Sequence, residues 1–159
     1  FRSKMVRAFL WGSQPGWVDA ARIMADDAAI SREFLRNLVR CRHHAHGYLL
    51  TGRFLGELDV RGDNPCLTAE CPGSFGGTYT LELPAVMATA WGAEDGRVGV
   101  VVCNMDDAEH TVIVTLPREA IVTKSVSTMD PDGHMDVAPV ARGAMKLVMP
   151  PRGALVVAV

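Results

Sequence analysis

Apolar residues recur at two different spacings along this chain, and the spacing changes near residue 52. Before that point they recur every three or four residues, which is typical of an amphipathic helix. After it, short apolar runs are separated by turn signals at intervals of about ten residues, which is typical of strands. We therefore divide the sequence into two predicted domains, residues 1–52 and residues 53–159.

The first part predicts one long helix from about Ser31 to Leu50. Ser31 is a favourable N-cap, and Gly52 is a plausible end signal. A short helix is also predicted over Ala20–Asp27. The apolar stripe of the long helix consists of Phe34, Leu35, Leu38, Ala45 and Leu49, with Arg42 in the same spacing.

The run Val6–Trp11 is apolar and predicts a strand, but no second strand-like run lies close to it in the sequence. A lone buried strand cannot satisfy its own backbone groups. This strand is therefore expected to belong either to a sheet completed by a partner or to a larger domain. Pairing with a second copy of the chain, giving a homodimer, is one way to complete it.

The second part predicts an antiparallel β-sandwich of about eight strands, preceded by the helical segment, so the fold class is mainly β. Asp95-Gly96 and Asp132-Gly133 are hairpin turn signals. The apolar run Val98–Val102 indicates a central strand covered on both faces. Residues Arg61–Gly77 are expected to form the longest irregular loop. The strand candidates are Phe54–Val60, Thr78–Leu83, Ala85–Trp91, Val98–Cys103, His110–Leu116, Ile121–Met129, Met135–Val140, Met145–Met149 and Ala154–Val159.

Composition excludes several classes of protein. Hydrophobic residues make up 48% of the 159 residues and charged residues 21%, which is typical of a globular chain and not of a disordered one. The net charge of −2 gives no electrostatic basis for binding nucleic acid or an anionic membrane. No apolar run reaches the length of about 18 residues that a membrane span needs. The compartment stays open, with the cytoplasm slightly favoured.

Neither cysteines nor histidines form a clear metal or disulfide framework. Cys66 and Cys71 share a stretch rich in glycine and proline and could close a small disulfide, although four cysteines are few for a disulfide scaffold. On a helix, His43 and His46 share one face, whereas Cys41 and His44 share another, so one ion cannot reach all four. We predict no metal site there and interpret these histidines as solvated or interfacial.

The acidic run from Asp130 to Asp136 has the two-residue spacing of a calcium loop, but its glycine and its twelfth residue, Ala141, do not fit one. A hairpin turn explains the same residues. Glu57 and Asp59 lie on one face of a short strand and are interpreted as solvent-facing charges rather than a catalytic pair. No nucleotide-binding loop and no nucleophile motif is present, so neither a cofactor nor a catalytic residue is predicted.

The order of segments resembles the C-terminal end of a TIM-barrel glycoside hydrolase, specifically the α-galactosidase-like group. The resemblance is carried by a Gly/Gln/Trp loop after the predicted strand, by the helix phrase, by the hairpin after Trp91 and by the closing run. These segments are Phe9–Trp17, Glu33–Arg42 with Tyr48–Gly52, Ala90–Asn104 and Met149–Val157. The resemblance implies that residues 1–52 are the last strand, loop and helix of a barrel, and that the sandwich follows the barrel.

Residues just after the last barrel strand lie at the face where barrel active sites form. The resemblance therefore implies that Trp11, Gln14 and Trp17 could contact a sugar, the tryptophans by stacking and Gln14 by hydrogen bonds. Alternatively, both tryptophans pack at a contact between barrel and sandwich.

The function predicted on this basis is that of a non-catalytic accessory sandwich that packs against the catalytic barrel of its own parent chain. The alternatives are a stand-alone carbohydrate-binding sandwich and a protein-interaction sandwich. A carbohydrate-binding sandwich would use exposed aromatics such as Tyr79 and Trp91, and a buried Trp91 would count against it.

Overall fold

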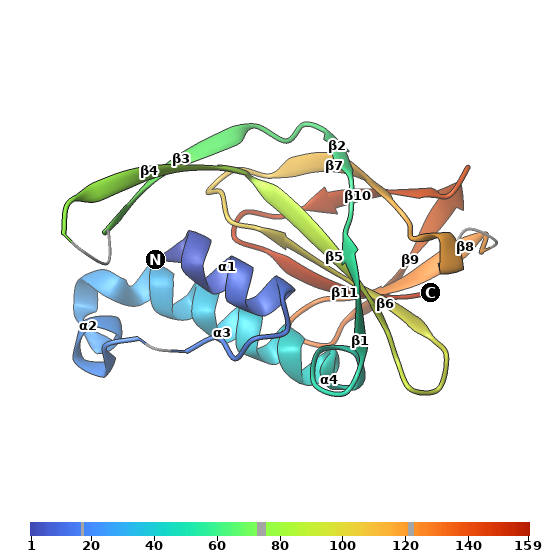
Figure 1. The fold of residues 1–159 in the computed structure, drawn as a ribbon, viewed down its shortest axis with the longest axis horizontal. Helices are drawn as coiled ribbons and strands as arrows, with labels where there is room; N and C mark the ends of the chain where they lie inside the picture. Colours follow the sequence, from blue (N-terminus) through green and yellow to red (C-terminus); the bar gives the residue numbers. More distant parts are fainter. Residues whose placement is uncertain (17, 73–75, 121–122) are drawn as a thin grey trace.

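A computed structural model describes residues 1–16, 18–72, 76–120 and 123–159. The chain forms a helical layer that covers one face of a curled antiparallel sheet (Figure 1). A two-stranded arm, formed by β3 and β4, projects from the sheet over the N-terminal helix. The mainly β fold class predicted from the sequence is therefore confirmed.

The helical layer consists of one long helix and several short ones. The long helix, α3, buries Phe34, Leu38 and Cys41, which confirms the predicted apolar stripe. It begins before Ser31, because its N-cap is Ala28, and it ends at His44 rather than at Leu50. The elements of the layer are α1 (Arg2–Leu10), α2 (Ala20–Met24), the 3₁₀ turn η1 (Asp26–Ala28), α3 (Ala29–His44) and α4 (His46–Leu49).

The strand predicted for Val6–Trp11 is wrong, because this segment belongs to helix α1. Its buried residues are Met5, Val6, Phe9 and Leu10, and this spacing places them on one helical face against the core. A short apolar run fits a buried strand and a buried helix equally well, so the pattern did not discriminate between them. The prediction of a homodimer depended on this strand, so it loses its basis as well.

The main sheet has nine strands in the order β1-β5-β6-β11-β8-β9-β10-β7-β2, and all neighbours are antiparallel. The predicted strand Phe54–Val60 is two strands, which lie at the two ends of this sheet. The strand predicted from Ile121 begins at Ser125, while residues 121–122 lie outside the described part. The strands are β1 (Arg53–Glu57), β2 (Val60–Gly62), β5 (Val86–Gly92), β6 (Val98–Asn104), β7 (His110–Thr115), β8 (Ser125–Met129), β9 (Met135–Ala141), β10 (Ala144–Met149) and β11 (Ala154–Ala158).

The predicted loop Arg61–Gly77 is wrong over its middle, where β3 (Cys66–Pro72) pairs with β4 (Thr78–Pro84). The alternation of Leu67 and Ala69 with Thr68 and Glu70 is a strand pattern that the nearby glycines and prolines obscured. The pairing also rules out the Cys66–Cys71 disulfide, and both thiols are free. Five residue steps along the strand place their Cα atoms about 16 Å apart, far more than a disulfide spans.

Strand β6 is buried along its whole length, as its apolar sequence predicted. Val101 and Cys103 pack against the helical layer together with Phe9 and Leu38. Val100 and Val102 point to the other side and pack inside the curled sheet against residues of β7 and β10. The protein therefore has two hydrophobic cores that share the β5–β6–β11 wall. No helix in the described part of the chain is long and apolar enough to cross a membrane.

We expect Gly99→Ala to destabilise the protein by about 1–3 kcal/mol, because overpacking a rigid core forces side chains off their preferred positions. A Cβ at Gly99 would lie 2.5 Å from a ring carbon of the buried Tyr48. The matched control is Gly47→Ala in α4, where nothing lies within 4 Å of the added atom. Urea unfolding should show the control within about 1 kcal/mol of the parent protein. Equal stability of Gly99→Ala and the parent would contradict this packing.

Candidate functional site

A groove of about 530 Å³ lies between helix α1 and the arm formed by β3 and β4. One wall comes from α1 and the residue that follows it, and the other comes from the apolar underside of the arm. Its volume lies within the range of about 300–1,000 Å³ that small-molecule sites occupy. The residues that line this groove are Phe1, Ser3, Lys4, Arg7, Ala8, Trp11, Glu70, Cys71, Tyr79 and Leu81.

Trp11, a predicted sugar-contact residue, lies in the wall of this groove at the C-terminal end of α1. Its indole N–H donates a hydrogen bond to Oε1 of Glu57, at 3.0 Å. The Arg7 guanidinium lies one helical turn back and sits 4.8 Å from the centre of the indole ring. Two contacts therefore hold the ring, while 46% of the residue stays exposed.

Of the other two predicted contact residues, one is described by the structure, and it does not extend this site. Gln14 is exposed in the loop after α1 and is not among the residues that line the groove. Trp17 lies outside the described residues. What sequence reasoning missed is that Tyr79 faces the groove from the arm, because it pairs with Cys71 across β3 and β4. The period-two pattern of Tyr79, Leu81 and Leu83 was the available signal.

Trp91, a candidate for a sugar platform on the sandwich, is 6% exposed and belongs to the core. Its indole N–H donates to the Thr89 hydroxyl at 3.1 Å, and that hydroxyl donates to the Leu10 carbonyl at 2.8 Å. The Phe54 ring meets Trp91 edge-on, at 5.0 Å between centroids. These contacts fix strand β5 against α1, so Trp91 is a structural residue and cannot stack on a ligand in this state.

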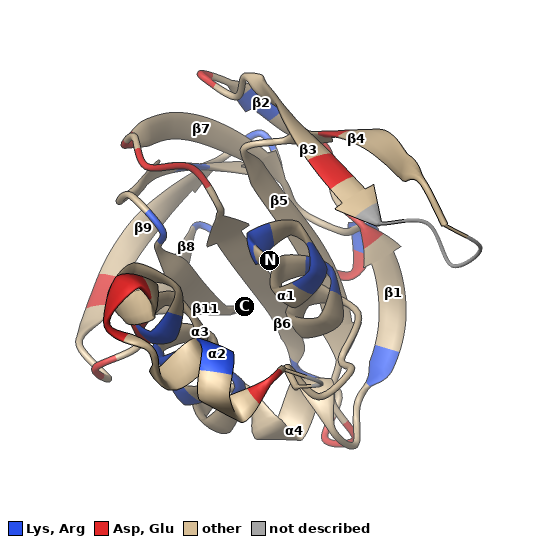
Figure 2. Ribbon diagram, turned by 90° about the vertical axis from the view of Figure 1, so that its left-hand side faces the viewer, with Lys and Arg blue, Asp and Glu red and all other residues tan. Residues whose placement is uncertain are grey.

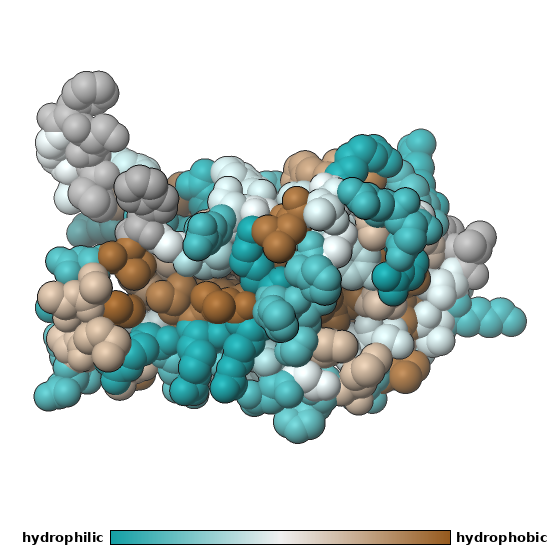
Figure 3. Space-filling model, turned by 90° about the horizontal axis from the view of Figure 1, so that it is seen from below, coloured by the Kyte–Doolittle hydropathy of each residue, from teal (hydrophilic) through white to brown (hydrophobic). Residues whose placement is uncertain are grey.

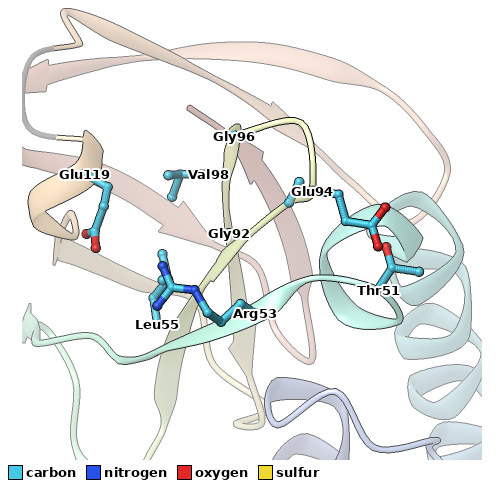
Figure 4. A pocket seen from close by; sticks show the side chains of 9 residues that line it. Thr51, Arg53, Leu55, Gly92, Glu94, Gly96, Val98 and Glu119 are labelled. Atoms are coloured by element: carbon cyan, nitrogen blue, oxygen red, sulfur yellow. The ribbon is translucent and has the colours of Figure 1, made fainter.

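A smaller cavity of about 230 Å³ lies where β1 meets the β5–β6 hairpin, and it contains Glu94 and Glu119 (Figure 4). Glycoside hydrolysis commonly needs two carboxyl groups that face each other across the bond to be cut. Here the two side chains come from different elements, and the Glu94 carboxylate lies beside Thr51 and points away from Glu119, with Arg53 between them (Figure 4). The arrangement is not that of a facing catalytic pair.

The carboxylates of Glu57 and Asp59 also have separate partners. Glu57 accepts the hydrogen bond from Trp11, and Asp59 forms an ion pair with Arg61 at 2.5 Å. Both acidic side chains therefore serve local contacts. Their positions agree with the interpretation of these residues as surface charges.

The segment from Cys41 to His46 is divided between core and surface. Cys41 is buried and donates a hydrogen bond to the Ala154 carbonyl at 3.4 Å, and burial raises the pKa of its thiol to about 12. A metal ion prefers the thiolate, so this environment opposes metal binding by Cys41. His43, His44 and His46 are exposed, and His44 Nε2 lies 3.3 Å from the Pro131 carbonyl.

The acidic run after β8 forms the predicted hairpin turn. The Asp130 carboxylate accepts hydrogen bonds from the backbone N–H groups of Asp132 and His134, at 2.9 Å each. Its second oxygen lies 3.0 Å from Nδ1 of His134. Asp132 pairs instead with Arg40 of α3 at 2.5 Å, which ties the turn to the helical layer.

A buried histidine joins two loops at the far end of the sheet. His110 is 4% exposed, and its two ring nitrogens lie 3.0 Å from Asp63 and 2.8 Å from Asp106. Burial alone would lower the pKa of His110, but the hydrogen bonds to the two carboxylates outweigh burial, and the pKa is raised above its ordinary value of 6.5. With both nitrogens bonded to acceptors, the protonated imidazolium is the form that fits this site.

We expect the free energy of unfolding to fall as the pH rises through the folded-state pKa of His110. A raised folded pKa means that the native protein binds the proton more tightly, so the stabilisation is complete below the unfolded pKa near 6.5. In His110→Gln, urea unfolding between about pH 6 and pH 8 should show a flatter dependence. His43→Gln, at an exposed position, should keep the parent slope. A full parent slope in His110→Gln would contradict the assignment.

We also expect iodoacetamide to modify the cysteines of the folded protein selectively. Cys66 is exposed and Cys71 is half-buried, whereas burial raises the pKa of Cys41 and of Cys103. Since the thiolate is the reactive form, peptide mass spectrometry should find rapid alkylation at Cys66, slower alkylation at Cys71 and none at the buried pair. All four should react in urea. Equal native rates at Cys41 and Cys66 would disprove the packing of α3.

Comparison with known proteins gives one sequence relationship, and no protein-family model matches the chain. Over 118 residues the chain is 37% identical to a Bacteroides thetaiotaomicron protein named "Putative glycoside hydrolase". That match covers 74% of this chain and 16% of the relative, so the chain spans about a sixth of that protein's length. Among solved structures, the crystal structure of the GH51 arabinofuranosidase from Xanthomonas axonopodis pv. citri matches with a TM-score of 0.37 and 18% identity, over 52% of this chain and 22% of that one. By sequence, the chain is therefore related to a glycoside hydrolase over about three quarters of its length.

Proposed function

We propose that this chain is a non-catalytic accessory domain of a carbohydrate-active enzyme and that it packs against the catalytic barrel of the same parent protein. The observation that carries the proposal is the 37% identity to a small part of a much longer glycoside hydrolase relative. We further propose that the parent belongs to the α-galactosidase-like group, on the strength of the order of the remaining segments, from the helix phrase Glu33–Arg42 to the closing strand.

The docking surface in this proposal is the outer face of the helical layer. Seen from the helical side, an apolar band crosses the half of this face on which α2 lies (Figure 3). Large apolar side chains are exposed on the helices and just after them, although helices that face only water carry mostly polar residues there. These exposed residues are Met24, Ile30, Val39 and Leu50. The band on the α2 half of this face is contiguous in Figure 3, and contiguous exposed apolar surface commonly marks an interface.

The charged residues of the chain also bear on which kind of partner this surface could dock against. Acidic and basic positions both lie on the helical end of the molecule (Figure 2), and residues 1–52 hold eight basic and four acidic side chains. Over the whole chain the net charge is −2, which gives no long-range attraction for a polyanion. The charge of the chain therefore gives no support to docking against nucleic acid.

We keep the division between residues 1–52 and 53–159 as part of the proposal, with one structural qualification. Residues on both sides of the boundary share a hydrophobic core, in which Phe9 and Leu38 meet Val101 and Val156. The helical segment therefore stabilises the sheet directly. In the proposed arrangement it is the middle layer between the sheet and the catalytic barrel.

The isolated chain is expected to hydrolyse no nitrophenyl glycoside, including the α-galactoside, whereas the full-length parent should hydrolyse one of them. Within the parent, Met24→Lys should loosen docking by about tenfold or more, because it places a charge in an apolar contact. The matched control is Met135→Lys on β9, since the two methionines are 67% and 66% exposed. Limited proteolysis at the junction between barrel and helices reports the docking.

Two results would overturn this proposal. Hydrolysis by the isolated chain would show that it is not an accessory domain. Equal proteolysis of Met24→Lys, Met135→Lys and the parent enzyme would show that the helical face is not the docking surface.

A further inference from the structure

We propose that the groove between α1 and the β3–β4 arm binds a saccharide, with Trp11 and Tyr79 as stacking residues on opposite walls. This inference rests on the proposed link to a carbohydrate-active enzyme. It goes beyond that link by assigning a site and a ligand class to the chain itself.

The first argument is the position of the two aromatic side chains. Trp11 comes from the end of α1 and Tyr79 from β4, and both line the same groove. They remain 46% and 52% exposed, so about half of each residue stays open to solvent. The apolar carbon–hydrogen face of a pyranose ring buries aromatic surface without demanding hydrogen bonds from it. Two exposed rings on facing walls suit a ligand with two such faces.

The second argument is that Trp11 is already held in place. The hydrogen bond to Glu57 fixes the indole edge, and the Arg7 guanidinium supports its ring. Binding to a ring that is held beforehand costs less side-chain entropy than ordering a mobile one. Because of these contacts, Trp11 is better suited to stack on a ligand than an exposed aromatic residue whose side chain is not held in place.

The third argument is the polar lining beside the rings. Ser3, Lys4 and Arg7 of α1 line the groove and carry hydrogen-bond donors, whereas the alternation of side chains along β3 turns the Glu70 side chain to the opposite face from Cys71. Sugar hydroxyl groups accept hydrogen bonds from donors of this kind, so the groove combines two aromatic rings with a few polar groups, as small-molecule sites do.

The arm is also suited to respond to a ligand. It is a two-stranded ribbon that pairs only with itself in the described part of the chain, and such ribbons are marginally stable on their own. Leu67 and Leu83 anchor its base to the helical core, while Tyr79 lies toward the other end. A saccharide held between Tyr79 and Trp11 would connect that end to α1.

The test uses the two reactive cysteines of the arm as reporters. Raffinose and cellotetraose serve as probes, and alkylation by iodoacetamide is followed separately at each cysteine. A bound saccharide should slow alkylation of Cys71, which lines the groove, and leave Cys66 unchanged at the base of the arm. The same protection is expected in the full-length parent. Absence of protection at Cys71 with both probes, or its loss in the parent, would overturn the proposal.

Variants then locate the binding. Calorimetry with the protective saccharide should show an affinity about fivefold weaker or more for Trp11→Ala and for Tyr79→Ala. Tyr79→Phe, which keeps the ring, should retain affinity. Phe54→Ala should also retain it, because Phe54 is an exposed aromatic outside the groove. Unchanged affinity in both alanine variants would overturn the site. The docking test of the proposed function is independent, because it reports on Met24 and not on this groove.

Discussion

The double burial of strand β6 is the constraint on which the rest of the structure depends. Its residues alternate between the helical core and the interior of the curled sheet, so this strand lies at the centre of the β5–β6–β11 wall that the two cores share. Gly99 allows the ring of Tyr48 to approach the strand closely, which fixes α4 against the sheet. The helices bury their apolar face against this strand together with its neighbours β5 and β11. Removing either layer would expose a valine-rich wall to water.

The position of the candidate groove follows from that arrangement. Helix α1 lies where its buried residues fit the outer face of β5 and β6, and Thr89 holds its last turn through the Leu10 carbonyl. The arm starts from the same wall, because Leu67 and Leu83 pack on the helical core. A rigid helix and a ribbon anchored only at its base are thus held at a distance from each other. The space between them is lined by whatever residues face inward, and here these include two aromatic rings.

Much of the fold could be predicted from the sequence, because apolar residues recur with a clear period in most strands and in the main helix. The run of valines in β6 indicated burial on both faces, and the Asp-Gly turns indicated the hairpins. The secondary structure predicted for two segments was wrong, and each error has a physical reason. The run Val6–Trp11 is too short for its apolar pattern to separate helix from strand. In residues 66–72 the strand alternation was masked by nearby turn formers. Of the site, Trp11 was predicted. The period-two pattern indicated which face of its strand Tyr79 occupies, but not that this face lies opposite Trp11, because that depends on tertiary packing.

The two end strands of the nine-stranded sheet, β1 and β2, are consecutive in the chain and are joined only through Leu58 and Asp59. The Leu58 N–H bonds to the Ala88 carbonyl, and the Asp59 carbonyl accepts from the Thr115 N–H, so this corner continues the pairing of both ends. One backbone cut between residues 57 and 60 would therefore remove the covalent link between the two end strands of the sheet. A cut at the Asp95-Gly96 turn would leave that link intact. Cleavage by a protease, or insertion of a segment, at the β1–β2 connection would therefore act on both end strands of the sheet.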